Sequence, residues 1–156
     1  MYPNSNISIV VEILQSAEPS ILEDAIRSDS ELVIMLPYSY LCRFHFDSLA
    51  HDNDATFSEI QEIFAIPNGR GDETPSVTIL FGEQHVAKFN PTEADHVRIL
   101  MALYRIEKKN VDLIVTFNVP VKLADGGAIE EGFQLAKRDF ETFVRSLQII
   151  DFDLFA

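Results

Sequence analysis

The chain has 156 residues and carries 12 basic against 25 acidic side chains, a formal net charge of −13 at pH 7. Because phosphate groups are bound by basic surfaces, this balance argues against a nucleic-acid-binding protein. No segment approaches the roughly 20 apolar residues that cross a membrane, and the sole cysteine, Cys42, favours a reducing compartment. The length predicts a single domain over residues 1–156. The single cysteine and the lack of a long apolar segment predict a soluble cytosolic or nuclear protein.

The acidic residues are concentrated in the first part of the chain, where residues 1–60 hold ten acids and two bases. Two interpretations stay open. The acidity can simply keep the protein soluble, or it can complement a basic surface on a protein partner.

The N-terminal part of the chain shows helical spacing. Four apolar residues are spaced as on one face of an amphipathic helix: Ile7, Val10, Val11 and Leu14. Asn6 is a suitable N-cap for that helix. We therefore predict a short helix over residues 7–14 and a second helical piece over 16–27.

Residues 40–47 alternate in polarity, which predicts a half-buried strand. One side of that strand would carry Tyr40, Cys42, Phe44 and Phe46, and the other Leu41, Arg43, His45 and Asp47. His45 and Asp47 could pair as a base and its orienting acid, but such a pair still needs a nucleophile and none is evident. Exposed polar side chains on a strand are the favoured interpretation of both.

The middle of the chain holds two ambiguous segments and one predicted hairpin. Residues 56–67 suit either a capped helix or a strand, and so do residues 96–106. Two β-rich runs within 76–89 flank Gly82-Glu83, which predicts a hairpin with a type II′ turn. The polar stretches 51–54 and 68–75 predict a turn and a loop.

The C-terminal part predicts a buried strand followed by a long helix. Residues 111–120 are mostly β-branched or aromatic and end at Pro120. From Ile129 onward the apolar residues form one stripe at helical period: Phe133, Phe140, Phe143, Val144 and Leu147. Consecutive strands with short connections predict an α+β fold with a central antiparallel sheet, and the predicted helices lie at both ends of the chain.

A search for catalytic chemistry is mostly negative. The sequence has no GxSxG, GxxxxGK[ST], GxGxxG or HExxH motif. The four histidines, His45, His51, His85 and His96, show no metal-ligand spacing. Cys42 is expected to be a buried inert thiol, and the tripeptide at 70–72, Arg-Gly-Asp, is interpreted as chance.

Five short strings resemble one protein family, in that family's order. They are SIVVEILQ (8–15), RFHFD (43–47), ILFGEQHVAKFN (79–90), LIVTFNVP (113–120) and FETFVRSLQIIDFDLFA (140–156). Together they are similar to the Ran guanine nucleotide release factors, the Mog family of nuclear import proteins.

The resemblance implies a fold and a function. The fold is a six-stranded antiparallel sheet with helices on both faces, shared with the PsbP proteins, and it favours strands at 56–66 and 96–106. The function is binding of the small GTPase Ran and promotion of nucleotide release, in nucleus and cytoplasm, without a catalytic centre, a cofactor or a membrane. A PsbP-like scaffold or adaptor that has lost Ran binding is the alternative.

The resemblance also points to partner-binding residues. Glu12 matches an acidic position implicated in Ran binding, Gln15 stands where a second acid is usual, and Arg43, His45 and Asp47 match the family's strand. The family's glycine-rich first strand and its V-P-D-x-Q-E-V segment have no match here. We therefore expect an open sheet edge that could support a homodimer.

Overall fold

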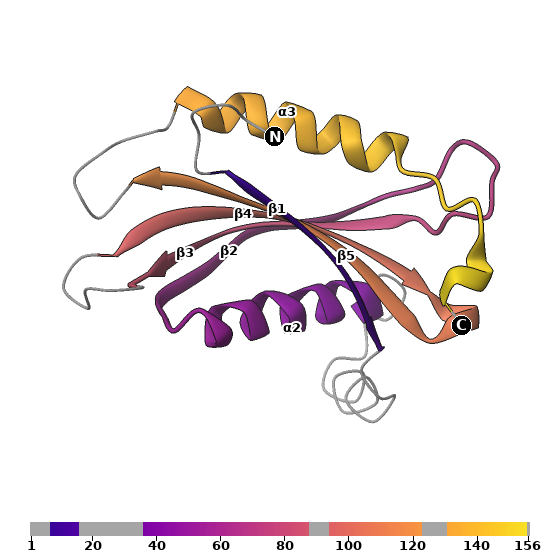
Figure 1. Cartoon of the computed structure of the whole chain (residues 1–156), viewed down its shortest axis with the longest axis horizontal. Helices are drawn as coiled ribbons and strands as arrows, with labels where there is room; N and C mark the ends of the chain where they lie inside the picture. Colours follow the sequence, from indigo (N-terminus) through magenta and orange to yellow (C-terminus); the bar gives the residue numbers. More distant parts are fainter. Residues whose placement is uncertain (1–6, 16–35, 88–93, 123–130, 156) are drawn as a thin grey trace.

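The computed structural model describes residues 7–15, 36–87, 94–122 and 131–155. Within them, five strands form one antiparallel sheet in the order β1-β5-β4-β3-β2 (Figure 1). The strands are β1 (Ser8–Gln15), β2 (Ala55–Ile66), β3 (Val77–Val86), β4 (Asp95–Ile106) and β5 (Val111–Lys122). The helices are α2 (Leu36–Asp52) and α3 (Glu131–Ser146), with short 3-10 turns η1 (Glu107–Lys109) and η2 (Phe152–Phe155).

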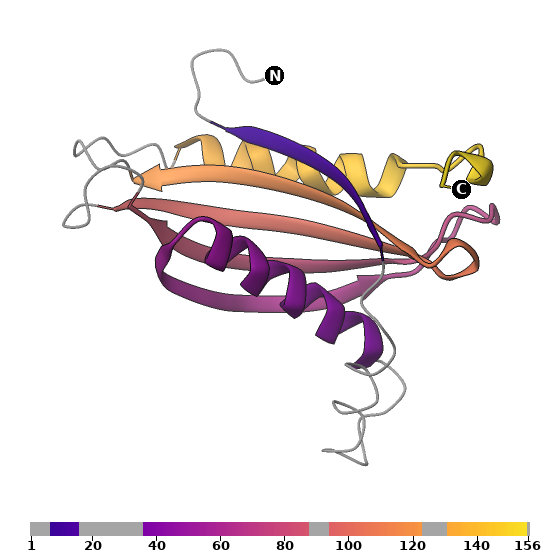
Figure 2. The same ribbon diagram turned by 60° about the horizontal axis from the view of Figure 1, so that its bottom comes forward.

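The two helices lie on opposite faces of the sheet (Figures 1 and 2). Helix α2 packs over β2, β3 and β4, and α3 packs over β5 and β4. Each helix therefore covers only part of its face. The predicted antiparallel sheet with helices on both faces is confirmed, with five strands described where the resemblance implied six.

Strands β4 and β5 form the buried centre of the sheet. β5 is buried along most of its length and β4 is buried from Ile99 to Tyr104. Helix α3 covers one face of both strands, and α2 covers the other face of β4. Phe117 of β5 meets Phe140 of α3 edge-on, with ring centroids 5.2 Å apart. The apolar stripe of α3 is thus the covering layer that its periodicity predicted, and the strands predicted at 56–66 and 96–106 are confirmed as β2 and β4.

Strand β1 corrects the helix predicted at residues 7–14. Its residues pair with β5 over the whole strand, from Ser8 opposite Asn118 to Gln15 opposite Val111. The segment is apolar on both sides and rich in Val and Ile, so pairing with a buried strand prevails over the helical spacing of four residues. The helical prediction for residues 16–27 lies outside the described residues.

Strand β3 corrects the hairpin predicted at 76–89, because Gly82 lies in the middle of one continuous strand. A Cβ built on Gly82 would lie 2.6 Å from Cζ of Phe46 and 2.8 Å from the backbone oxygen of Glu59. The glycine therefore allows α2 and β2 to approach β3 closely, a use of glycine in strands that differs from a turn.

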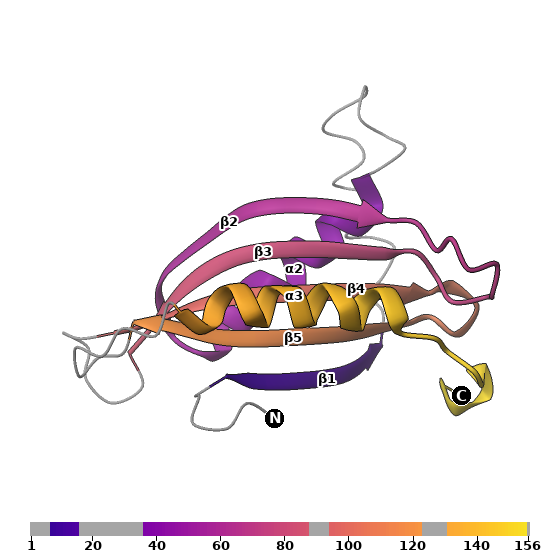
Figure 3. The same cartoon turned by 90° about the horizontal axis from the view of Figure 1, so that it is seen from above.

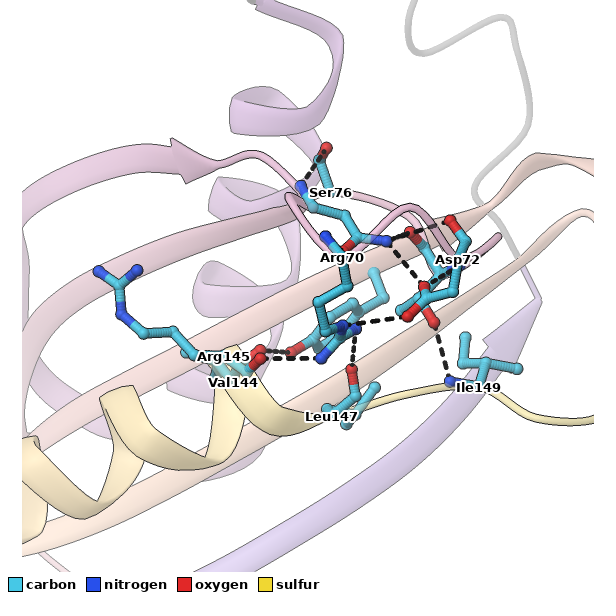
Figure 4. Close-up of polar contacts among 10 residues, drawn as sticks. Arg70, Asp72, Ser76, Val144, Arg145, Leu147 and Ile149 are labelled. Atoms are coloured by element: carbon cyan, nitrogen blue, oxygen red, sulfur yellow. Dashed lines mark hydrogen bonds and ion pairs between the residues drawn. The ribbon is translucent and has the colours of Figure 1, made fainter.

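The predicted loop at 68–75 is ordered by its own side chains and holds the end of α3 (Figure 4). Asn68 donates from Nδ2 to Asp72 Oδ1 at 2.7 Å and to the Thr74 oxygen at 2.8 Å. Arg70 donates to the backbone oxygens of Arg145 at 2.8 Å and Leu147 at 2.5 Å. The guanidinium thus satisfies carbonyls that a helix C-terminus leaves without partners, which gives the Arg-Gly-Asp tripeptide a structural role.

Candidate partner-binding surface

Helix α2 carries three of the predicted site residues, and it corrects the strand predicted at 40–47. Its buried residues occur as neighbouring pairs one turn apart: Leu41, Cys42, His45 and Phe46. That pairing is the inward side of a helix, whereas a strand would bury alternate residues. Burial raises the pKa of the Cys42 thiol to about 12, so the expected inert cysteine is confirmed.

His45 points into the molecule, where it contacts a buried acid on the sheet. Its Nε2 lies 3.0 Å from Oδ2 of Asp112 on β5, and the other carboxylate oxygen accepts a hydrogen bond from Arg105 on β4 at 2.9 Å. Burial alone raises the pKa of Asp112, but the hydrogen bonds and charges of His45 and Arg105 outweigh it and hold that pKa below its usual range. His45 therefore anchors α2 to the sheet and is not paired with Asp47.

The start of α2 is tied to the same end of the sheet. Tyr38 donates a hydrogen bond from its hydroxyl to Oε1 of Glu107, in the short turn between β4 and β5. This bond, together with burial, raises the pKa of Tyr38 to about 12. Tyr38 and His45 together fix the orientation of α2, and with it the direction in which its outer side faces.

Arg43 and Asp47 lie on the outward side of α2. They line a shallow depression together with Tyr40, Phe44, Ser48, His51 and Asp52. Phe44 is 39% exposed, which is unusual for a large aromatic side chain on a helix that also buries an inward side. The outward side thus combines exposed aromatic surface with two acids, a composition suited to a protein partner.

Glu12 and Gln15 lie on opposite faces of β1. Glu12 pairs with Ile114, which belongs to the α2-side core, so Glu12 is on the α2 side of the sheet. Gln15 pairs with Val111 of the α3-side core and is on the other side. On a helix residues three apart would share a face, but side chains alternate along a strand. The structure therefore brings Glu12 to the face of α2 and separates Gln15 from it.

A groove runs between β1 and the C-terminal part of α2. Its lining includes Val10 of β1, Leu49 of α2, and Gln84, Ile99 and Asn118 from the sheet between them, and its volume is about 400 Å³. Gln84 is fully buried and donates from Nε2 to the Phe46 oxygen at 3.1 Å. The groove connects the α2 side of β1 to the helix, so Glu12, Arg43 and Asp47 belong to one face of the molecule.

Sequence reasoning missed Tyr40 and Phe44 as surface residues, because it placed them on the apolar side of a strand. The signal that could have placed Phe44 is the pair pattern 41, 42, 45 and 46, which leaves position 44 outside the inward side.

A group of three residues that could bind a metal ion lies elsewhere, on the α3 side of the sheet: Glu83, His85 and His96. None of the described helices is long and apolar enough to cross a membrane.

The sequence matches the family described as Ran-interacting Mog1 protein over residues 1–120. The chain belongs to this family. It is 27% identical over 122 residues to the Ran guanine nucleotide release factor of Danio rerio, a match that spans 72% of this chain and 67% of the relative. A probable Ran guanine nucleotide release factor of Dictyostelium discoideum is 34% identical over 86 residues, 49% of this chain and 44% of that protein.

Solved Mog1 structures share the fold. The chain is similar to a crystal structure of the Saccharomyces cerevisiae Ran-binding protein Mog1p, with a TM-score of 0.58, 21% identity, and coverage of 97% of this chain and 71% of that one. A mutant of protein Mog1 gives a TM-score of 0.57 at the same identity and spans 72% of that chain. At this identity the likeness concerns the fold. The chain thus spans less than three quarters of each of these Mog1 chains, and less than half of the Dictyostelium relative.

Proposed function

We propose that this protein binds the small GTPase Ran through the α2-side surface and promotes release of its bound nucleotide. The observation that carries the proposal is the family match over residues 1–120. The Danio and Dictyostelium relatives are named as Ran guanine nucleotide release factors, which supports nucleotide release as the outcome of binding. The geometry of the surface supports Glu12, Arg43 and Asp47 as contact residues. We propose that the protein acts in the nucleus and the cytoplasm.

The surface has the composition of a protein interface with an acidic rim. Phe44 supplies exposed aromatic area, and Asp47 and Glu12 supply negative charge on the same face. Aromatic residues contribute most of the binding energy in many interfaces, whereas rim charges mainly speed the encounter with a partner of opposite sign. The net charge of −13 favours a basic partner surface.

Release by binding needs no covalent chemistry in this chain. A ligand that binds nucleotide-free Ran more tightly than nucleotide-bound Ran shifts the equilibrium toward release by its differential affinity. Cys42 is buried with a raised pKa, and His45 holds a structural acid, so neither is placed to attack a substrate. We propose that the chain acts as a release factor by binding and not as an enzyme of covalent chemistry.

The test measures release of a fluorescent GDP analogue from Ran, together with the affinity of the two proteins. The wild-type chain is expected to bind and to accelerate release, and Phe44→Ala should weaken binding roughly tenfold if it is a central contact. Asp47→Lys should slow association, and most at low salt. The matched control is Asp151→Lys, which changes an exposed acid away from α2 and should leave both values unchanged.

Two outcomes would contradict the proposal in different ways. Normal binding by both α2 variants would place the Ran contact on another surface. A folded chain that neither binds Ran at low salt nor accelerates release would instead favour the scaffold or adaptor function.

A further inference from the structure

Three potential metal ligands meet on the α3 side of the sheet, far from α2. Glu83 and His85 are two residues apart on β3, so their side chains share a face. His96 of β4 is the direct cross-strand partner of His85. The end of β3 and the start of β4 lie side by side at one end of the sheet (Figure 3). The register between β3 and β4 thus brings His96 next to Glu83 and His85.

The ligand atoms of these three residues already lie close together. His85 Nε2 is 2.9 Å and His96 Nδ1 is 3.8 Å from the same oxygen, Glu83 Oε1. The donor atoms all lie within 4.8 Å of one another. Zinc–ligand bonds of about 2.0–2.2 Å place tetrahedral ligand atoms about 3.4 Å apart, which is within the range of the separations found here.

We propose that Glu83, His85 and His96 bind a divalent transition-metal ion, with Zn²⁺ as the fitting ion. Two imidazoles and one carboxylate are the ligand set of zinc sites that keep a fourth position open. The set has no thiolate and only one hard oxygen ligand, which disfavours Cu⁺ and Ca²⁺. The fourth position is left for water or for a ligand atom from a partner protein.

The surroundings partly preorganise the two imidazoles. The His85 and His96 rings stack with centroids 3.7 Å apart and planes 7° apart, and Phe57 of β2 packs against His85 at 4.5 Å. Parallel rings direct their nitrogens in separate planes, so binding requires the His96 ring to tilt. His96 is 31% exposed at its side chain, which leaves room for that movement.

Two basic residues lie near the site. Arg98 is opposite Glu83, but its guanidinium lies over the Phe133 ring of α3 at 4.4 Å. Lys122 of β5 is opposite His96 and is exposed. Its charge opposes a bound cation, so removing that charge should strengthen metal binding. An ion held by both β3 and β4 would link the end of β3 to the start of β4 at this end of the sheet.

The experiment titrates the full chain with Zn²⁺ after chelator treatment and follows heat of binding and melting temperature. We expect one ion per chain, and at least about tenfold weaker binding for Glu83→Gln, His85→Asn and His96→Asn, since loss of a supporting partner alone costs that much. Lys122→Gln should bind more tightly. His51→Asn is the matched control, because His51 is exposed on α2, and it should bind as the wild type does.

Histidine ring ¹⁵N NMR of the wild type makes the test independent of variant folding. Zn²⁺ should shift the ring signals of His85 and His96 and leave those of His45 and His51 in place. Binding that persists unchanged in all three ligand variants, shifts confined to His45 or His51, or no saturation up to millimolar Zn²⁺ would each overturn the proposal. Ran binding is not part of any readout, so this result is independent of the proposed function.

Discussion

His45 of α2 and Asp112 of β5 lie 3.0 Å apart, and both side chains are almost entirely buried. The Asp112 carboxylate also accepts a hydrogen bond from Arg105 of β4 at 2.9 Å. One acid thus joins a helix to two central strands. Because a buried carboxylate is costly unless its partners satisfy it, these contacts depend on one another. The outward side of α2, proposed as the Ran contact, is positioned by this inward network.

Loss of the acid should destabilise the fold. Asp112→Ala leaves the Arg105 and His45 side chains without their shared acceptor, and we expect a loss of roughly 3 kcal/mol in the free energy of unfolding. Urea unfolding at neutral pH measures this loss. His45→Ala should cost less, because Asp112 keeps its bond to Arg105. Equal stability of wild type and Asp112→Ala would show that the network does not contribute to folding.

The same pair predicts a pH dependence. The pKa of Asp112 is lowered in the folded state by its contacts with His45 and Arg105. A lowered folded pKa means that the unfolded chain binds more protons, so the stability contributed by Asp112 is present above the ordinary carboxyl pKa of about 3.9 and is lost as pH falls through the lowered value. The stability difference between wild type and Asp112→Asn should therefore shrink on acidification below about pH 4. A difference that stays constant from pH 7 to pH 3 would contradict this assignment.

Gly82 predicts an unusual penalty for a small substitution. Alanine is normally better than glycine in a strand by roughly 0.5–1 kcal/mol, but a methyl group here meets the Phe46 ring and the Glu59 backbone. We expect Gly82→Ala to destabilise the fold by about 1–3 kcal/mol, because backbone on one side cannot move away. Gly69→Ala is the control, since nothing lies within 4 Å of its added carbon. Thermal unfolding of both variants distinguishes crowding of the new methyl group at position 82 from a general effect of alanine.

Arg70 predicts local fraying at the end of α3. Arg70→Ala removes both hydrogen bonds to the backbone oxygens of Arg145 and Leu147, and should cost about 1–2 kcal/mol. Arg70→Lys should recover part of this, because an ammonium cannot donate to both carbonyls with the fixed geometry of a guanidinium. Hydrogen exchange should speed up in the last turn of α3 while the strands stay protected. Uniformly faster exchange across the sheet would indicate a global role instead.

The sequence predicted the elements whose pattern has a single interpretation. The stripe through Phe133 and Phe140 fits only a helix, and the β-branched run at 111–120 fits only a buried strand. The strand prediction for residues 40–47 was wrong. Every second residue there is apolar or aromatic, but the buried residues are the neighbouring pairs 41, 42 and 45, 46. The segment thus carries both an alternating and a helical pattern, and its packing against Gly82 and Asp112 favours the helix.

The candidate site was less predictable, because it depends on which face each residue occupies. Glu12 and Gln15 would share a face on a helix, and the strand separates them. His85 and His96 form no motif along the chain, and they meet only through the register of β3 with β4. The tertiary pairing of strands is a non-local property, so residues that converge through it carry little local signal.

Strand β1 leads to the last prediction, self-association through the edge of the sheet. Among the described strands it pairs with β5 alone, and Ile9, Val11 and Ile13 are exposed on its α3 side. An edge strand with free backbone groups and apolar side chains favours pairing with a second copy.

We predict concentration-dependent dimerisation in sedimentation velocity at high micromolar protein. Val11→Lys should abolish it, because charge on an edge strand opposes pairing. Ile150→Lys removes an even more exposed apolar side chain outside the sheet and should leave the dimer intact. A wild-type chain that sediments as a monomer throughout this range would count against the edge pairing.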